Sequence, residues 1–184
     1  MTGQAPGSAR LYEEWLVTAA MSGDREAAGR LVARYQPRLL RTARRMLGDA
    51  DQAASAVQEA WVAIVPGIKR LRHPARFAPF AFSILRRRCV DTIRSAQRGR
   101  AVFDTSADVE AAGDAAQDEA LAIRQAFALL PPDQRLAAHL FFVEGLTLAE
   151  IAEVQGVPQG TAKSRLFHAR QRLKAALTPI QGED

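Results

Sequence analysis

Apolar residues recur along most of the chain at the three- and four-residue spacing of an amphipathic helix. No segment of the sequence shows the sustained alternation of apolar and polar residues that indicates a strand. The pattern predicts helices at residues 11–21, 24–48, 51–66, 74–98, 117–130, 132–144, 147–155 and 159–177. We therefore expect an all-α fold.

The last two predicted helices form a helix-turn-helix. The first of them begins with a capping box, in which Thr147 and Glu150 each accept a hydrogen bond from the other's backbone N–H. Gly156 follows where a left-handed residue ends a helix, and Pro158 fits the first turn of the next one. The residues expected to face the core are Leu148, Ile151 and Ala152.

The second helix of this pair separates apolar from basic residues. Its apolar stripe consists of Ala162, Leu166, Ala169 and Leu173. Residues 161–174 contain five Lys or Arg and no acid, whereas residues 117–160 contain two Arg and six acids. A helix that enters the major groove needs this concentration of positive charge near the phosphates. The alternative is an ordinary helical hairpin with a solvated basic face.

Two helices of the first half have clear buried faces. The helix at 24–48 presents an apolar face formed by Leu31, Tyr35, Leu39, Ala43, Met46 and Leu47. The helix at 51–66 is expected to bury Ala53, Ala56, Val57, Ala60, Trp61, Ile64 and Val65. Gln58 and Glu59 then lie on its outward face.

Residues 68–94 interleave cations with aromatic side chains. Phe77, Phe80 and Phe82 are followed by three consecutive arginines that begin at Arg86. Aromatic rings beside cations suit single-stranded DNA, because unstacked bases lie on the rings and the backbone follows the positive charge. The alternative is that the phenylalanines fill a core and the arginines are merely solvated.

Charge divides the chain into parts. The net charge is +9 for residues 1–98, −3 for residues 99–116 and −1 for residues 117–184, within a total of +5. The middle part consists mainly of small and acidic residues and has few large apolar ones. It can therefore bury too little apolar surface to offset the conformational entropy lost on folding. We expect an N-terminal extension at 1–23, two small helical domains at 24–98 and 117–178, and a flexible acidic linker at 99–116. An alanine-rich helix from residue 107 onward is the alternative for the linker.

Several kinds of site are not expected. The one cysteine, Cys89, allows no disulfide within the chain, and His73, His139 and His168 are too scattered to indicate a metal cluster. No nucleophile elbow or phosphate loop is recognisable, so we expect no enzyme, cofactor or small-molecule substrate. The longest apolar run is too short to cross a bilayer and the N-terminus lacks a signal-peptide core, which predicts a cytoplasmic protein without membrane insertion.

These motifs, in this order, resemble the extracytoplasmic-function (ECF) group of bacterial sigma factors. Residues 34–39 and 43–49 resemble the start of sigma region 2, and Ala56-Val-Gln-Glu-Ala-Trp61 resembles its polymerase-binding segment. Residues 77–94 resemble the promoter-melting segment. Three further segments resemble region 4, namely residues 129–135, residues 142–152 and Gly160-Thr-Ala-Lys-Ser-Arg-Leu-Phe-His-Ala-Arg170.

The resemblance implies a subunit that lends promoter recognition to core RNA polymerase, contacts its β′ and β subunits and directs transcription initiation. In the family, the positions of Gln58 and Glu59 dock on a coiled coil of β′. The minus-ten element, as duplex and as melted single strand, is expected to meet Phe80, Arg86 and Arg87. The minus-thirty-five element is expected to meet Lys163, Ser164, Arg165, Phe167 and His168. An anti-sigma factor is a further expected partner.

The chain departs from the family's pattern at some of these positions. Ala54 and Ser55 stand where an acidic pair is usual, which leaves less negative charge on the docking surface. Arg87 replaces an asparagine that often reads a flipped base, and His168 replaces an arginine. Two other functions stay open: a sigma-like protein that binds an anti-sigma factor without transcribing, and a stand-alone helix-turn-helix regulator.

Overall fold

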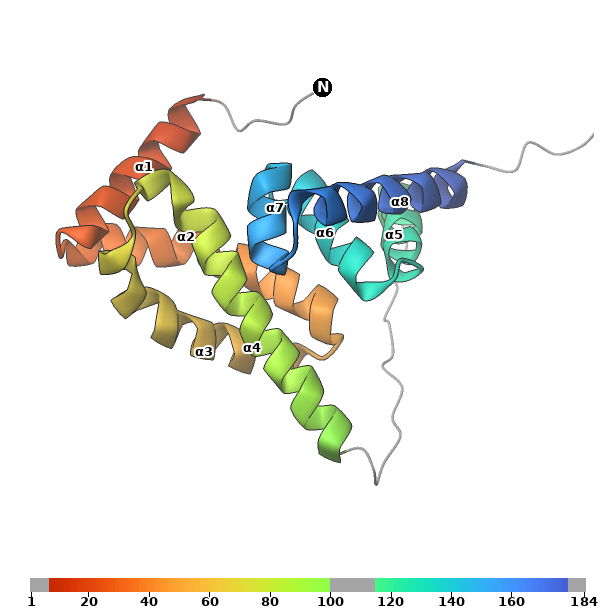
Figure 1. Cartoon of the computed structure of the whole chain (residues 1–184), viewed down its shortest axis with the longest axis horizontal. Coiled ribbons are helices and arrows are strands. Elements are labelled where there is room, and N and C mark those ends of the chain that lie inside the picture. Colours follow the sequence, from red (N-terminus) through yellow and green to blue (C-terminus); the bar gives the residue numbers. More distant parts are fainter. Residues whose placement is uncertain (1–6, 100–114, 179–184) are drawn as a thin grey trace, which may run out of the picture.

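The computed structural model describes residues 7–99 and 115–178, and every regular element in these residues is helical (Figure 1). The N-terminal bundle comprises α1 (Gly7–Met21), α2 (Arg25–Leu47), α3 (Ala50–Gly67), the 3-10 turns η1 (Ile68–Arg70) and η2 (Pro74–Arg76), and α4 (Phe77–Gly99). The C-terminal bundle comprises α5 (Ala115–Ala128), α6 (Pro132–Phe142), α7 (Leu148–Gln155) and α8 (Gln159–Leu177). The all-α prediction is confirmed. Most of the expected linker lies outside the described residues.

Side chains next to the helix ends fix the boundaries of α2 and α3. The carboxylate of Asp24 accepts from the backbone N–H of Glu26 at 2.8 Å and from that of Ala27 at 3.0 Å. Asp49 caps α3 in the same way through the N–H of Gln52 at 2.7 Å. Gly48, with φ of +76°, ends α2 in the left-handed region. The connection between these two helices is therefore short and well defined.

The core of the N-terminal bundle follows the predicted faces of α2 and α3, except at Trp61 and Val65 on α3. Leu31, Tyr35, Leu39 and Ala43 are buried on α2, while Met46 and Leu47 are partly buried. On α3, Val65 was expected to be buried but is 55% exposed, because the buried stripe runs through Val57, Ala60 and Ile64 and leaves Val65 at its solvent edge. Trp61 is half-buried and donates from Nε1 to Oε1 of Gln36 at 2.6 Å.

Helix α1 joins the same core. Leu16, Val17 and Ala20 are buried, and the helix packs against α2 and both 3-10 turns. The helix begins at Gly7, four residues before the predicted start. Part of the expected N-terminal extension is therefore a packed element of the bundle.

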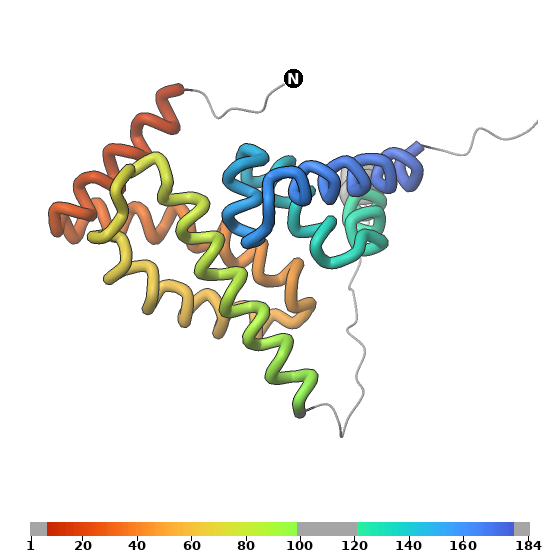
Figure 2. Tube along the Cα trace, in the orientation of Figure 1, coloured from red at the N-terminus to blue at the C-terminus, as the bar shows by residue number. Residues whose placement is uncertain are grey.

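The two bundles pack directly against each other. The C-terminal bundle has a small core of its own that includes Phe127, Leu130, Leu166 and Ala169. Other side chains of α6 and α7 belong instead to the core shared with the N-terminal bundle: Leu136, Leu140, Ile151, Ala152 and Val154. Helix α7 lies against α4 and α6 lies against α2 (Figure 2). We call this packed state the closed arrangement; the sequence pattern did not predict it.

Candidate nucleic-acid and polymerase interfaces

The helix-turn-helix is formed by α7 and α8 with the predicted turn chemistry. The Glu150 N–H donates to Oγ1 of Thr147 at 3.3 Å, and the Thr147 N–H donates to Oε2 of Glu150 at 2.8 Å, so the capping box is confirmed. Gly156 ends α7 with φ of +64°. Pro158 was expected in the first turn of α8 but is its N-cap, because its backbone is extended and the helix begins at Gln159. Leu148 is partly buried rather than buried.

Helix α8 buries its apolar stripe and exposes a basic face. Ala162, Leu166, Ala169 and Leu173 are buried, as predicted. Lys163, Ser164 and His168 are exposed, and so is Phe167, whose ring packs edge-to-face on that of His168. A surface groove runs along this face, lined in part by Lys163, Phe167, Arg170 and Lys174. Sequence reasoning left Arg170 and Lys174 out of the candidate site, although they follow Lys163 and Phe167 at helical spacing.

Arg165 lies differently from the other candidate DNA-contacting residues of α8. Its Nη1 donates to Oε1 of Gln155 at 2.9 Å, and its Nη2 donates to Oδ2 of Asp133 at 2.6 Å. Gln155 is buried and donates from Nε2 to the carbonyl oxygen of Asp133 at 2.8 Å. Arg165 therefore ties α8 to α7 and α6, which fixes the angle at which the basic face is presented.

The aromatic and basic side chains of α4 divide between core and surface. Phe77 and Phe82 are buried, and the ring of Phe77 contacts Tyr35 edge-to-face with centroids 4.7 Å apart, so the core interpretation holds for these two. Phe80 is half-buried against Gly67, where an added Cβ would lie 2.8 Å from the ring. Arg87 is exposed, whereas Arg86 is half-buried beside a cavity between the bundles.

Helix α3 presents an exposed stripe of mixed character. Gln58 and Glu59 are exposed, as predicted. Val62 and Val65, which follow at helical spacing, are 77% and 55% exposed. Apolar side chains beside polar ones are typical of a protein–protein interface. We call these four residues the α3 stripe.

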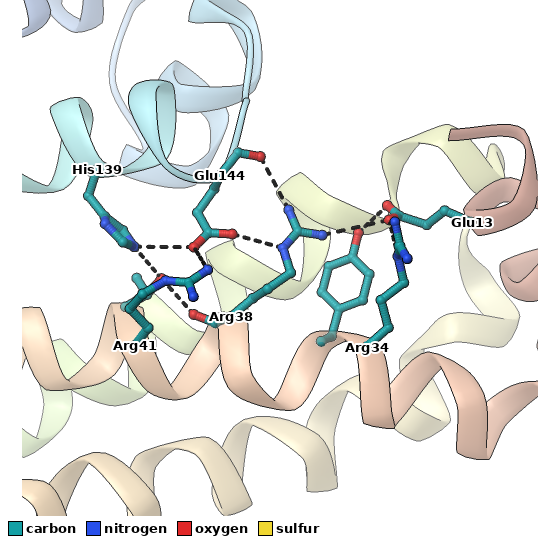
Figure 3. A network of polar contacts seen from close by, with 8 residues as sticks. Glu13, Arg34, Arg38, Arg41, His139 and Glu144 are labelled. Carbon is teal, nitrogen blue, oxygen red and sulfur yellow. Dashed lines mark hydrogen bonds and ion pairs between the residues drawn. The ribbon is translucent and has the colours of Figure 1, made fainter. Parts of the chain in front are cut away.

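A buried ion network holds the closed arrangement together (Figure 3). Glu144, just after α6, has a side chain that is only 1% exposed. Its carboxylate accepts from Nε of Arg38 at 2.8 Å and from Nη2 of Arg41 at 3.0 Å, both on α2. Nε2 of His139 lies 3.4 Å from the same carboxylate and 2.9 Å from Oγ1 of Thr42. We call these contacts the Glu144 network.

The network continues across the N-terminal bundle to α1. Nη1 of Arg38 lies 3.6 Å from a carboxylate oxygen of Glu13, and its guanidinium lies 4.5 Å from the ring centre of Tyr35. Glu13 also accepts from Arg34 and from the hydroxyl of Tyr35. A separate ion pair joins Arg76 to Glu153 at the surface. Sequence reasoning missed these contacts, because partners that lie between 21 and 106 positions apart leave no periodic signal.

The Glu144 network shifts two pKa values downward. Burial by itself raises the pKa of Glu144, but hydrogen bonds from His139 and Arg38 outweigh burial and hold that pKa at about 2. Burial also lowers the pKa of His139 below its ordinary 6.5, and the nearby Arg45 and Arg41 lower it further, while Glu144 opposes the shift. Both groups therefore favour the closed arrangement when they are deprotonated.

We expect the closed arrangement to weaken as the pH falls below 6.5. A histidine with a depressed pKa contributes its full stabilisation above 6.5 and loses it progressively in acid; Glu144 adds a second loss between pH 4.5 and 2. Energy transfer between dyes on Ser55→Cys and Ala175→Cys, both exposed positions, measures the separation of the bundles. The response between pH 6.5 and 4.5 should disappear in His139→Gln. An identical pH profile in that variant would assign the response to other groups.

Other kinds of site find no support in the described part of the chain. Within residues 7–99 and 115–178, no group of three or more metal-ligating side chains comes together. None of the helices described is long and apolar enough to cross a membrane. Cys89 is buried, and burial raises the pKa of its thiol to about 12, so little reactive thiolate is present.

Comparison with known proteins gives both bundles a family. Residues 31–99 match the family model of sigma-70 region 2, and residues 120–173 match that of sigma-70 region 4. The RNA polymerase sigma-H factor of Pseudomonas aeruginosa is 31% identical over 190 residues, which cover 93% of this chain and 96% of that protein. The chain belongs to the ECF group of the sigma-70 family. This sigma factor directs promoter-specific transcription initiation with core RNA polymerase and is not an enzyme.

Further relatives of this sigma factor agree with the assignment. The ECF RNA polymerase sigma factor SigM of Mycobacterium tuberculosis is 31% identical over 170 residues, which cover 88% of this chain and 83% of that protein. The fold is shared with the sigma factor RpoE in complex with the anti-sigma factor NepR from Bartonella quintana, at a TM-score of 0.68 and 24% identity over 83% of this chain and 98% of that one. CnrH in complex with the cytosolic domain of CnrY gives a TM-score of 0.65 and 25% identity over 90% and 97% of the chains.

Proposed function

We propose that the exposed basic face of α8 reads the minus-thirty-five element of the promoter. The observation that carries this proposal is the position of Lys163, Ser164, Phe167 and His168 on one exposed face of the second helix in a capped helix-turn-helix. Lys163 can neutralise a backbone phosphate, and the neighbouring side chains can reach base edges in the major groove. Arg165 acts mainly by orienting the helix, since Asp133 and Gln155 already engage its guanidinium.

The same proposal assigns the minus-ten element to α4 and polymerase docking to α3. Phe80 offers a half-exposed ring on which an unstacked base can lie, and Arg87 offers an exposed guanidinium to the strand. Arg86 becomes available when the C-terminal bundle moves away from it. The α3 stripe provides Gln58 and Glu59 for polar contacts with β′ and two valines for an apolar centre.

The closed arrangement is proposed to be the resting form. The positions that name the two promoter elements, minus thirty-five and minus ten, differ by about 25 base pairs, which is roughly 85 Å of duplex at about 3.4 Å per base pair. A compact chain of this length has a radius of gyration of only about 16 Å. The bundles must therefore separate before one molecule can contact both elements, and polymerase binding supplies the free energy for that separation.

We further propose that a protein partner of the anti-sigma class binds the closed arrangement in the cytoplasm. A related chain, CnrH, was captured with the cytosolic domain of CnrY, and the fold is similar over nearly the whole length of both chains. Such a partner gains affinity for the resting form if it contacts both bundles at once. Co-purification from the native host, followed by mass spectrometry of the bound protein, tests this part of the proposal.

Lys163→Ala should weaken promoter binding and lower the slope of log affinity against log salt by about 1. The side chain is exposed on α8, so its removal should leave folding and polymerase binding unchanged. Arg165→Ala should also lower the stability of the C-terminal bundle, because it leaves Gln155 and Asp133 without their partner. Arg25→Ala, an exposed charge loss on α2, is the control. Equal salt slopes for Lys163→Ala and Arg25→Ala would remove α8 from the DNA interface.

Run-off transcription tests the function as a whole. Purified core RNA polymerase is incubated with a pool of promoter-length genomic fragments, with and without this protein. Discrete new transcripts that share an upstream and a downstream motif support the proposal and identify the promoter. No transcripts, together with no polymerase binding, would instead favour a sigma-like protein that only occupies an anti-sigma factor.

A further inference from the structure

A cavity of about 130 Å³ lies at the boundary between the two bundles. Helices α2 and α4 supply one wall, and the first turns of α6 supply the other. Its volume equals that of roughly four water molecules in the liquid, at about 30 Å³ each. A tetrahedral oxyanion fits such a space, whereas a larger ligand must extend through the opening.

The lining of this cavity is rich in guanidinium groups. Arg45 and Arg86 come from the N-terminal bundle, and Arg135 comes from the C-terminal bundle. The only carboxylate in the lining, that of Asp133, already accepts from Arg165 at 2.6 Å. No carboxylate whose side chain the structure describes forms a direct ion pair with Arg45 or Arg86. Glu144 is close enough to act on Arg45 but is already engaged by Arg38 and Arg41, so the cations outnumber the carboxylates at this boundary.

Hydrogen bonds hold the guanidinium of Arg135 in place, but one of its N–H groups has no acceptor among the described residues. Its Nη2 donates to the carbonyl oxygens of Ala128 at 2.7 Å and Leu130 at 2.9 Å, which fixes the guanidinium at the cavity wall. Its Nε is buried and has no hydrogen-bond partner among the described residues. A buried donor without a partner costs free energy, so a small shift of the guanidinium that brings Nε to an acceptor in the cavity is stabilising.

The surroundings of Arg45 show the same excess of positive charge. Burial lowers the pKa of Arg45, and Arg41, Arg124 and Arg135 each lower it further, while Glu144 opposes the shift. Its guanidinium also lies 5.1 Å from the ring centre of Phe127, so it is held between the bundles rather than extended into water. An anion near this group would relieve the repulsion between the cations.

We propose that this cavity binds a phosphate group, which bridges Arg45 and Arg86 to Arg135 and thereby stabilises the closed arrangement. Planar guanidinium groups match the oxygens of a phosphate with paired, charge-assisted hydrogen bonds. Because the two walls belong to different bundles, the bound phosphate must leave or lose its contacts with one wall when the bundles separate. It also occupies Arg86, one of the proposed contacts to the minus-ten element. The regulatory consequence rests on the proposed function, whereas phosphate binding itself does not.

Titration calorimetry on the full chain tests the site. Inorganic phosphate and adenosine monophosphate are titrated separately, and sodium chloride keeps the ionic strength equal in the two titrations. Arg45→Met keeps an unbranched apolar stem beside Phe127 and should weaken binding at least about tenfold. Arg44→Met removes the same charge from the adjacent, exposed position and should bind phosphate like the wild type. Tighter binding of the nucleotide would identify a phosphate ester as the ligand, and tighter binding of inorganic phosphate would identify the free ion.

A second readout links binding to the arrangement of the bundles. Phosphate should raise the energy transfer between dyes at positions 55 and 175 in the wild type and leave it unchanged in Arg45→Met. Absence of phosphate binding to the wild type, or equal affinity for Arg45→Met and Arg44→Met, overturns the proposal. Both measurements use the free protein without polymerase, so a failure here is separate from a failure to transcribe.

Discussion

Glu144→Gln should open the closed arrangement. The substitution keeps the shape of the side chain but removes the charge that Arg38 and Arg41 share at 2.8 and 3.0 Å. Loss of one partner from a buried ion pair costs about 3 kcal/mol or more. The Glu144 side chain is 1% exposed, and Arg38, 21% exposed, loses its nearest carboxylate when Glu144 is neutralised. The ratio of closed to open molecules should therefore fall on the order of 100-fold. Energy transfer between dyes at positions 55 and 175 should drop accordingly.

Glu153→Gln is the matched control for this experiment. It breaks a surface ion pair between the bundles, that of Arg76 and Glu153, whose side chains are 44% and 42% exposed. An exposed pair contributes only about 0–1 kcal/mol, so this variant should stay closed. If the two variants behave alike, burial of Glu144 is not what holds the bundles together.

The opened variant should also bind its targets more tightly. Only open molecules are proposed to bind both promoter DNA and core polymerase, so the closed fraction lowers the apparent affinity for each. Glu144→Gln raises the open fraction and therefore the apparent affinity. The gain should appear in both equilibrium binding and run-off transcription. Circular dichroism checks that helix content is unchanged. Weaker promoter binding by a folded, opened variant would mean that the closed arrangement is the DNA-binding form.

Glu59→Lys should weaken binding to core polymerase on the order of 100-fold, because like charges brought together across an interface cost several kcal/mol. Helix α3 carries only two acids, Asp51 and Glu59. Glu59 is the one acidic residue of the α3 stripe and supplies all of its negative charge. Biolayer interferometry with immobilised core polymerase measures the change, and binding of isolated DNA should be unaffected.

Asp51→Lys makes the same charge reversal on the same helix. Asp51 is exposed in the first turn of α3, two turns away from Glu59, so its replacement should change polymerase affinity much less. Thermal unfolding of both variants separates a docking defect from a folding defect. Equal losses in the two variants would indicate a general electrostatic effect rather than a docking contact at Glu59.

Local sequence signals predicted the helices and the helix-turn-helix well. The spacing of Ala162, Leu166, Ala169 and Leu173 predicted the buried stripe of α8, because helical periodicity depends only on residues within a few turns. The capping box at Thr147 and the left-handed Gly156 likewise depend only on residues close by in the sequence. The exposed positions of Lys163 and Glu59 follow directly from these patterns.

Only the tertiary structure decided which charged residues meet across the chain. Arg38 and Glu144 are separated by 106 positions, and nothing in either segment indicates the other. The docking of α6 on α2 also places Arg86 beside a cavity, and the packing of α6 to α8 engages Arg165 with Asp133. The sequence by itself determined the helices, their buried faces and the basic helix, because these depend on neighbours along the chain. The closed arrangement, its buried network and its cavity depend on how two separate helical bundles pack, which periodicity does not encode.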